Sequence, residues 1–175
     1  VEWMGYYAYG DCGGNLGIVK SGAHVHDGGS VFSLGASKYI QAYLADSVLA
    51  LKFGVKFDDL PASAASNTTC LQAFLNYVTI NNREGVLGWG VAWHNGLTIT
   101  KSSRLRGIKT SGPEFGIRTS YAGSTLRNNS TTQSSITIDA TGNPNNVGLH
   151  AVWNDFTVYG NRSEERRVGK ECLRL

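Results

Sequence analysis

The chain has 175 residues, 41% of them hydrophobic, a formal net charge of +3, and 22 glycines against three prolines. This length fits one ordinary domain or two small ones and excludes a large multidomain enzyme. The last fourteen residues hold five basic and three acidic groups, so the net charge of the remainder is only +1. A near-neutral body gives no electrostatic case for nucleic acid as a partner.

The sequence indicates neither a membrane segment nor a cofactor. No window reaches the roughly 18 consecutive apolar residues that a membrane-spanning helix needs. The first residue, Val1, is neither an initiator Met nor part of a signal peptide. We therefore expect that the given sequence begins inside a longer chain. Three isolated cysteines, Cys12, Cys70 and Cys172, fit neither a disulfide framework nor a zinc site. They suggest folding in a reducing cytosol.

Residues 1–45 are predicted to form a small β-rich module. Short aromatic and β-branched runs alternate there with glycine pairs, a pattern typical of short strands joined by turns. The glycines after His26 and Asp27 can adopt positive φ without strain and so favour a turn. Strands are expected at residues 6–9, 18–19, 31–34 and 39–42.

The next segment is predicted to contain one strand, at residues 48–53, and one helix, at about 67–81. Either Asn67 or Ser66 can cap this helix with a side-chain oxygen. Four apolar residues recur at i, i+3, i+4 and i+7 and give the helix one apolar stripe: Leu71, Phe74, Leu75 and Val78.

Residues 85–161 read as short strands separated by polar turns, each too short to be stable alone. The pairs Leu97/Ile99, Ile136/Ile138 and Phe156/Val158 each place two apolar side chains on one face, with Thr opposite. Such faces suit a stack of about three or four coils, with the preceding helix covering its open end. Strands are expected at 86–87, 91–93, 97–100, 105–108, 136–138, 147–149 and 156–158.

Residues 51–58 (LKFGVKFD) followed by 67–75 (NTTCLQAFL) resemble the opening motif of the pectate-lyase-like right-handed parallel β-helix family, approximately FGAKGDG and then DDTAAIQAAL. Asp58 matches the aspartate of GDG and Gln72 matches the family's glutamine. Phe57 replaces the first glycine of GDG, so the turn must differ locally.

The resemblance extends over about residues 46–161, and 156–161 (FTVYGN) is similar to the family's recurring LTIDGN strand. Asn67 stands where the family usually has an Asp that caps the helix. The implied fold is mostly β: a small module, a capping helix and the first coils of a parallel β-helix.

Upstream, residues 27–32 (DGGSVF) with 38–40 (KYI) resemble the small module that precedes the β-helix in many bacteriophage tailspikes and tail fibres. This resemblance implies a virion protein, made in the host cytoplasm, that forms a homotrimer beside other phage tail proteins. It also implies binding of bacterial surface polysaccharide, capsule or O-antigen, and often its depolymerisation. The fragment itself would then be structural.

Two alternative functions stay open. One is a non-catalytic virion adhesin or adaptor, and the other is a cellular pectate-lyase-like polysaccharide enzyme. No family catalytic residue can be carried over, because the family's sites usually lie on later coils. Whether the protein is an enzyme is therefore left open by the sequence.

Acidic residues are sparse in the predicted coils: Glu114, Asp139 and Asp155. Glycoside cleavage commonly uses two carboxylates about 5 to 10 Å apart. Asp139 and Asp155 each adjoin a predicted strand, so stacking could bring them together. They are the candidate catalytic residues, and a solvated acid in a turn is the ordinary alternative.

The histidines and tryptophans have both functional and structural interpretations. His24 and His26 could share a metal, but no third ligand is visible, so no metal site is predicted. His94 and His150 are expected at the surface or hydrogen-bonded in the core. Trp89, Trp93 and Trp153 could stack on sugar rings, although burial is the favoured interpretation.

Residues 162–175 differ sharply in composition from the rest of the chain. Residues 162–172 (RSEERRVGKEC) match, codon for codon, the translation of a short-read sequencing adapter, whereas the ordinary interpretation is a solvated charged tail. We therefore interpret 162–175 as an artefactual tail and exclude it from functional reasoning. On this interpretation the natural protein continues beyond Asn161.

Overall fold

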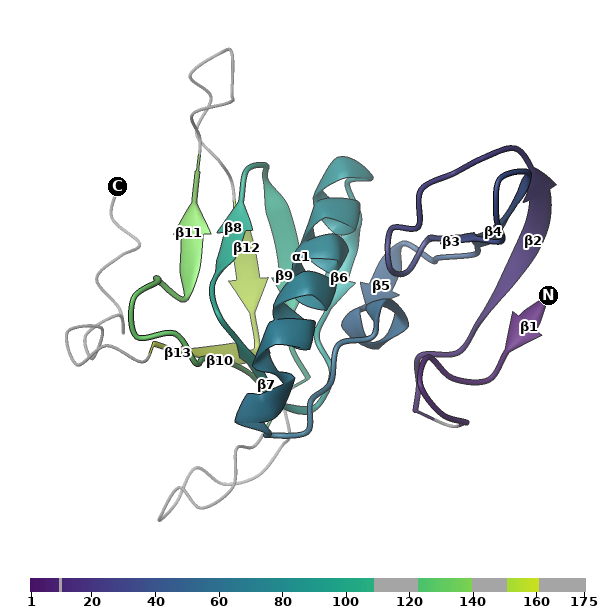
Figure 1. The fold of residues 1–175 in the computed structure, drawn as a ribbon. Coiled ribbons are helices and arrows are strands. Elements are labelled where there is room, and N and C mark those ends of the chain that lie inside the picture. Colours follow the sequence, from purple (N-terminus) through teal and green to yellow (C-terminus); the bar gives the residue numbers. More distant parts are fainter. Residues whose placement is uncertain (10, 109–122, 140–150, 161–175) are drawn as a thin grey trace, which may run out of the picture.

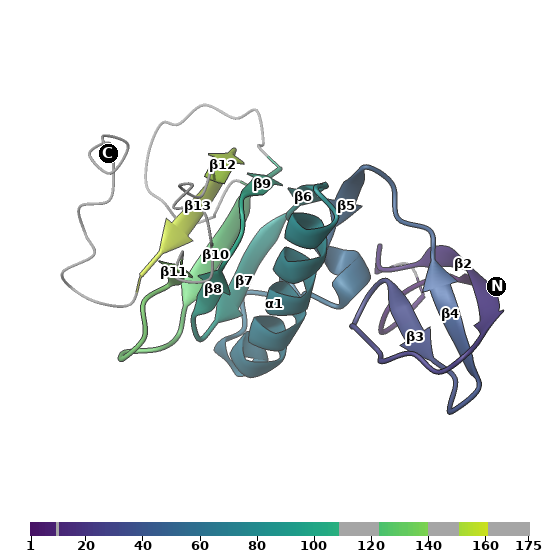
Figure 2. The same cartoon turned by 90° about the horizontal axis from the view of Figure 1, so that it is seen from above.

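The computed structural model describes residues 1–9, 11–108, 123–139 and 151–160. Within these ranges the chain forms one antiparallel sheet, one α-helix and three parallel sheets (Figure 1). Seen from above, the antiparallel sheet lies at one end of the molecule, the helix lies next to it, and the parallel strands follow beyond the helix (Figure 2).

The N-terminal sheet has the order β1-β2-β4-β3, and all its neighbouring strands are antiparallel. Trp3 and Phe32 pack edge to face on it, with ring centroids 5.2 Å apart. The predicted strands at 18–19 and 39–42 are confirmed within β2 and β4, and the one at 31–34 is confirmed as β3 except for its last residue. The bounds are β1 Glu2–Trp3, β2 Asn15–Ser21, β3 Val31–Ser33 and β4 Lys38–Ala42.

The predicted strand at 6–9 is wrong. The carboxylate of Asp11 accepts the backbone N–H groups of Tyr6 (2.8 Å), Tyr7 (2.6 Å), Ala8 (3.0 Å) and Gly13 (2.8 Å) and gathers this segment into a loop. Burial raises the pKa of Asp11, but these backbone donors outweigh it and lower the pKa to about 2. A single side chain thus overrides the strand propensity of the tyrosines.

Two of these tyrosines attach the loop to the rest of the molecule. The Tyr6 hydroxyl donates to the Gly28 carbonyl (2.9 Å), and the Tyr7 hydroxyl donates to the Gly54 carbonyl (2.8 Å). Burial, followed by the nearby Cys70 thiol, raises the pKa of Tyr6 to about 12. Both hydroxyls therefore stay protonated donors at neutral pH.

The strand predicted at 48–53 is present only in its first half. Strand β5, Ser47–Leu49, gives way to a 3-10 turn, η1, over Ala50–Phe53. Gly54 ends this turn at φ 80°, and its N–H donates to the Leu51 carbonyl (3.0 Å). A positive φ suits glycine because it has no Cβ to clash with the backbone.

Helix α1 spans Ala64–Ile80 and follows a short 3-10 turn, η2, over Pro61–Ser63. Its predicted apolar stripe is confirmed, since all four residues are buried. The predicted capping role of Asn67 is wrong, because this residue lies inside the helix and is fully buried. Its amide instead accepts the Lys56 N–H (2.8 Å) and donates to the Lys56 carbonyl (2.8 Å), joining the preceding segment to the helix.

Beyond α1 the chain visits three parallel sheets in a repeating order. These sheets are β5-β6-β9-β12, β7-β10-β13 and β8-β11, and every neighbouring pair in them is parallel. We call each visit to the three sheets a pass. The bounds are β6 Glu84–Val86, β7 Gly90–His94, β8 Leu97–Ile99, β9 Ser103–Arg106, β10 Ser124–Asn128, β11 Ile136–Ile138, β12 Ala151–Asn154 and β13 Phe156–Tyr159.

The core is built by residues that repeat from pass to pass. Ala92, Leu126 and Val158 occupy the same register position on β7, β10 and β13. Leu97 likewise aligns with Ile136. The helix stripe packs against the same cluster of buried side chains. The predicted strand at 147–149 lies outside the described residues.

Strand β10 has no counterpart among the predicted strands, because its buried side chains are largely polar. Ser124 is 2% exposed, yet its hydroxyl donates to the Gly88 carbonyl (2.7 Å) and accepts the Ile108 N–H (2.8 Å). Thr125 and Asn128 are buried as well. Burying a polar group costs little free energy when the group keeps a hydrogen-bond partner. A strand can therefore lie in the core without an apolar sequence pattern.

Candidate functional site

At the helix end of the parallel sheets, each strand of the first pass has a partner. Strand β6 pairs with β5. The N–H of Asp59 donates to the Val91 carbonyl of β7 (3.0 Å). The side-chain amide of Gln72 accepts the Thr98 N–H of β8 (3.0 Å) and donates to the Thr98 carbonyl (2.8 Å). Gln72 therefore binds the edge of β8 as a peptide group of a neighbouring strand would.

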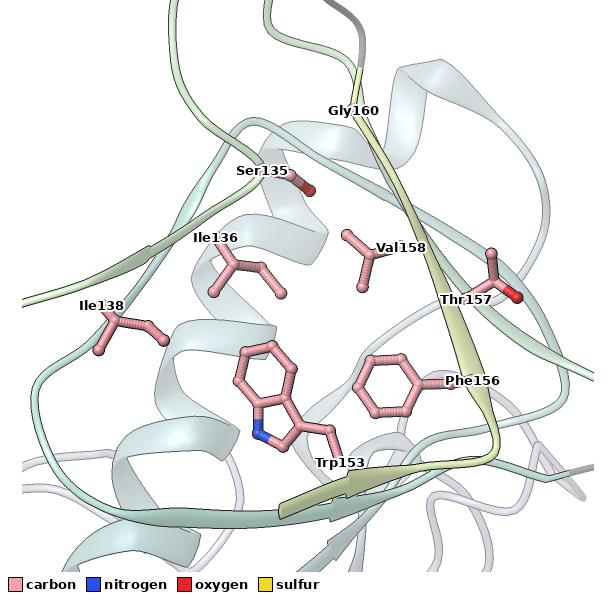
Figure 3. Close-up of a pocket in the computed structure, with 8 residues that line it drawn as sticks. All are labelled: Ser135, Ile136, Ile138, Trp153, Phe156, Thr157, Val158 and Gly160. Carbon is pink, nitrogen blue, oxygen red and sulfur yellow. The ribbon is translucent and has the colours of Figure 1, made fainter. Parts of the chain in front are cut away.

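At the opposite end the last strands surround a hollow of about 540 Å³, which is the candidate functional site (Figure 3). Strands β11, β12 and β13 each contribute to its lining. The described residues that line it are uncharged. They are Ser135, Ile136, Ile138, Trp153, Phe156, Thr157, Val158 and Gly160.

Apolar side chains from three strands converge in this hollow. Ile136 and Ile138 lie on one side, Phe156 and Val158 on the other, and Trp153 between them (Figure 3). The Trp153 indole N–H donates to the buried Ser103 hydroxyl (3.1 Å), so its polar atom has a partner while its ring lines the hollow. Ile138 is 55% exposed and Val158 39% exposed.

Among the described residues, this lining offers apolar groups that can be buried and no side chain that could act as an acid or a base. Acid–base cleavage of a glycosidic bond needs carboxyl groups at the scissile bond. Sequence analysis predicted the apolar pairs at Ile136/Ile138 and Phe156/Val158 but not the hollow that they share. The available signal was the alternation of apolar residues over 136–138 and 156–158.

A second feature is a polar corner between the second and third sheets. His94 and Asn128 occupy the same register position on β7 and β10. His94 Nδ1 accepts the Gly96 N–H (3.1 Å), and Nε2 lies 3.2 Å from the Ser135 hydroxyl. Asn128 repeats this arrangement, since its Oδ1 accepts an N–H two residues later, from Ser130 (3.0 Å).

Of the two predicted positions for His94, at the surface or hydrogen-bonded in the core, the structure shows the second. His94 is fully buried, and this burial lowers its pKa to about 4. Because Nδ1 accepts a hydrogen bond, the neutral ring carries its proton on Nε2 and donates to Ser135. His150 lies outside the described residues.

Trp93 and Trp153 are half-buried, and Trp93 is held from two directions. Its indole N–H donates to the Asp59 carboxylate (2.9 Å), and the guanidinium of Arg127 lies over its ring, 4.4 Å from the centroid. Arg127 is in register with Trp93 on the next strand. This contact favours a role in fixing the strand register.

The predicted burial of Trp89 is wrong, since this side chain is 61% exposed. The glycines on either side lie against Phe57. A Cβ at Gly88 would come within 2.6 Å of the Phe57 ring, and one at Gly90 within 2.7 Å of the Phe57 carbonyl oxygen. With the backbone in contact with Phe57, the Trp89 side chain extends outward.

The candidate catalytic carboxylates lie at different corners of the stack. Asp139 follows β11, and its N–H donates to the Ile99 carbonyl (2.9 Å). Asp155 is the exposed residue between β12 and β13, at φ 60°. Strand β12 separates these two corners along the chain. Glu114 lies outside the described residues, and a catalytic role for Asp139 or Asp155 stays a prediction.

His24 and His26 both contact aromatic rings of the N-terminal sheet. The His24 ring lies 4.1 Å from that of Tyr39, and the His26 ring 5.3 Å from that of Phe32. Among the described residues, no group of three His, Cys, Asp or Glu side chains is placed to hold a metal ion. Within the same ranges, no helix has both the length and the apolar character needed to cross a bilayer.

The chain has a tailspike-like fold. Among solved structures it is similar to the tailspike protein gp49 from Acinetobacter baumannii bacteriophage Fri1, a capsular polysaccharide depolymerase, with a TM-score of 0.53 and 15% identity. The match covers 90% of this chain and 33% of that one, so this chain spans about a third of the length of that tailspike. No protein-family model matches the sequence. No curated protein matches it.

Proposed function

We propose that this chain is the N-terminal part of a bacteriophage tailspike, comprising the cap and the first coils of a right-handed parallel β-helix of the pectate-lyase-like family. One observation carries the proposal: strands at the same point of successive passes pair in parallel, and their first edges are covered by α1 and β5. The fold likeness to a phage tailspike supports it.

We assign to the full-length protein the binding and depolymerisation of bacterial surface polysaccharide, either capsule or O-antigen. That protein would be a homotrimer in the phage tail. The part described here would be structural, since the described residues that line the hollow are uncharged and suit the packing of side chains. Asp139 and Asp155 remain the candidate catalytic residues.

The test is incubation of the full-length protein with purified capsular polysaccharide or O-antigen of the host. Release of oligosaccharides, followed by size-exclusion chromatography and mass spectrometry, is the expected result. Asp139→Asn and Asp155→Asn variants, with Asp58→Asn as a control in the loop before α1, would separate a catalytic role from a structural one. Release that survives both substitutions would remove these two residues as catalysts.

The uncharged lining also favours a second candidate, a non-catalytic adhesin or adaptor. Binding of polysaccharide without any release of oligosaccharide would select it. If the protein neither binds polysaccharide nor releases oligosaccharide, both candidates are contradicted. A cellular pectate-lyase-like enzyme is distinguished by its gene neighbours, which would not encode virion parts.

A further inference from the structure

We propose that residues 6–8 and 11–13 form a clasp, which holds the N-terminal sheet against η1 and α1 and can open while both parts of the chain stay folded. The two parts are the sheet, with strands β1 to β4, and the segment from β5 onward, which contains α1 and the parallel sheets. The inference concerns described residues alone and does not rest on the proposed function.

Each of the two parts has interactions of its own. Among the described residues, strands β1 to β4 pair only with one another, and β5 begins the first parallel sheet. Trp3 packs on Phe32 within the N-terminal sheet, whereas the buried cluster around α1 has its first member at Val48. Figure 2 shows the N-terminal sheet and the parallel strands on opposite sides of α1. Both parts can therefore keep their packing when the sheet moves away from α1.

The contacts between the two parts lie at η1 and at the glycine that ends it. The Tyr7 hydroxyl donates to the Gly54 carbonyl (2.8 Å), and the Tyr6 ring lies so close to Gly54 that a Cβ there would collide with it. Beside the clasp, the backbone of Gly29 lies against the Phe53 ring. The clasp thus crosses the boundary with one hydrogen bond and one ring–backbone contact, and a single hydrogen bond contributes little net stability.

Asp11 makes the clasp a single unit. Its Oδ1 accepts the N–H groups of Tyr6 and Gly13, and its Oδ2 accepts those of Tyr7 and Ala8. The rings of Tyr6 and Tyr7 are thereby held edge to face, with centroids 4.9 Å apart. An amide in place of the carboxylate would offer one acceptor oxygen to these four donors. Loss of the carboxylate should therefore loosen both tyrosines together.

The exposure of Tyr7 lets the clasp open at low cost. Its side chain is 54% exposed, and the Lys56 ammonium lies 4.4 Å from its ring centroid, a contact that is weak at an exposed site. When the clasp opens, water can bind both the Tyr7 hydroxyl and the Gly54 carbonyl, so neither group is left without a hydrogen bond. The Tyr6 hydroxyl donates to Gly28, within the N-terminal part, and keeps this bond.

Cys70 on α1 supplies a reporter of the opening. Its half-buried thiol lies close to the hydroxyls of Tyr6 and Tyr7. The test uses the 175-residue chain with Cys12→Ser and Cys172→Ser, so that Cys70 is the only remaining cysteine. The rate of its alkylation by iodoacetamide is measured at one pH.

Two variants should be alkylated faster than this parent. The rate should rise about fivefold in Tyr7→Phe, which loses one hydrogen bond across the boundary, and by at least as much in Asp11→Asn, which loosens both tyrosines. Tyr9→Phe is the matched control, because this tyrosine of the same segment is 84% exposed, and it should leave the rate unchanged.

Spin labels measure the position of the sheet directly. In a chain whose native cysteines are replaced by serine, labels are attached at Lys20→Cys on β2 and Thr69→Cys on α1, both exposed positions. Double electron–electron resonance should give one narrow distance distribution for the parent and an additional, longer distance in Asp11→Asn. Hydrogen exchange of the amides in β2, β4 and α1 should stay as in the parent, because both parts remain folded.

Several results would overturn the proposal. Faster alkylation confined to one of the two variants would show a local effect on the thiol. Faster alkylation with unchanged spin-label distances would show that the loop moves without the sheet. Faster exchange of the α1 amides together with faster alkylation would show that Cys70 becomes exposed by unfolding. Unchanged alkylation in both variants would show that no clasp covers the thiol.

Discussion

Acidification should destabilise this protein through His94 before most carboxylates are protonated. The ring is fully buried, Nδ1 accepts the Gly96 N–H, and burial lowers the pKa to about 4 from the ordinary 6.5. Below pH 6.5 the unfolded chain binds a proton on this ring, whereas the native chain does so only near pH 4. Stability is therefore complete above pH 6.5 and falls as the pH decreases through this window.

The two pKa values set the size of the effect. The His94 contribution to the free energy of unfolding decreases by about 2 kcal/mol between pH 7 and pH 5, and by about 3 kcal/mol once the native ring is protonated. Urea unfolding at pH 7, 6 and 5, followed by far-ultraviolet circular dichroism, measures this decrease.

His94→Asn is the informative variant, because Asn128 already performs the corresponding contact one pass later. The variant should fold and lose about 2 kcal/mol less stability than the parent between pH 7 and pH 5. His24→Asn, at an exposed position, should keep the parental pH dependence. If the parent and His94→Asn lose the same stability over this range, His94 is not a buried neutral residue and the reasoning fails.

Two further predictions concern the side-chain amides that join α1 to its neighbours. Asn67→Asp should lower the free energy of unfolding by about 2 to 4 kcal/mol, because a buried carboxylate cannot donate to the Lys56 carbonyl. The control is Ser66→Asp, at an exposed position one residue away. It should change the free energy of unfolding by less than about 0.5 kcal/mol in the same urea unfolding experiment. Gln72→Glu should cost about 1 to 2 kcal/mol at pH 7, since a carboxylate loses the bond to the Thr98 carbonyl, and this cost should shrink at pH 3. A pH-independent cost in Gln72→Glu would contradict the peptide-like role of Gln72.

The sequence predicted those features that depend on apolar periodicity. The helix stripe at Leu71 and Phe74 and the paired faces at Leu97 and Ile136 are where the structure has them. The parallel pairing of the later strands, which the family resemblance implied, is also observed. These signals survive because burying alternate or helically spaced apolar side chains fixes the element and its orientation.

The elements that the sequence predicted wrongly or missed involve polar side chains that form hydrogen bonds with the backbone. Asp11 gathers the tyrosine segment into a loop, and Asn67 pairs with Lys56 from within the helix instead of capping it. Ser124 takes a buried place in β10 through two hydrogen bonds. The hollow depends on β11 from one pass and on β12 and β13 from the next, so no local pattern could locate it.

Coverage of one set of edges gives the molecule a direction of assembly. Because α1 precedes β6 and every later strand along the chain, it leaves the ribosome before them. Gln72 and the apolar stripe are thus available as a template when the first strands emerge. Synthesis and folding can therefore advance in the same order, from α1 toward β13.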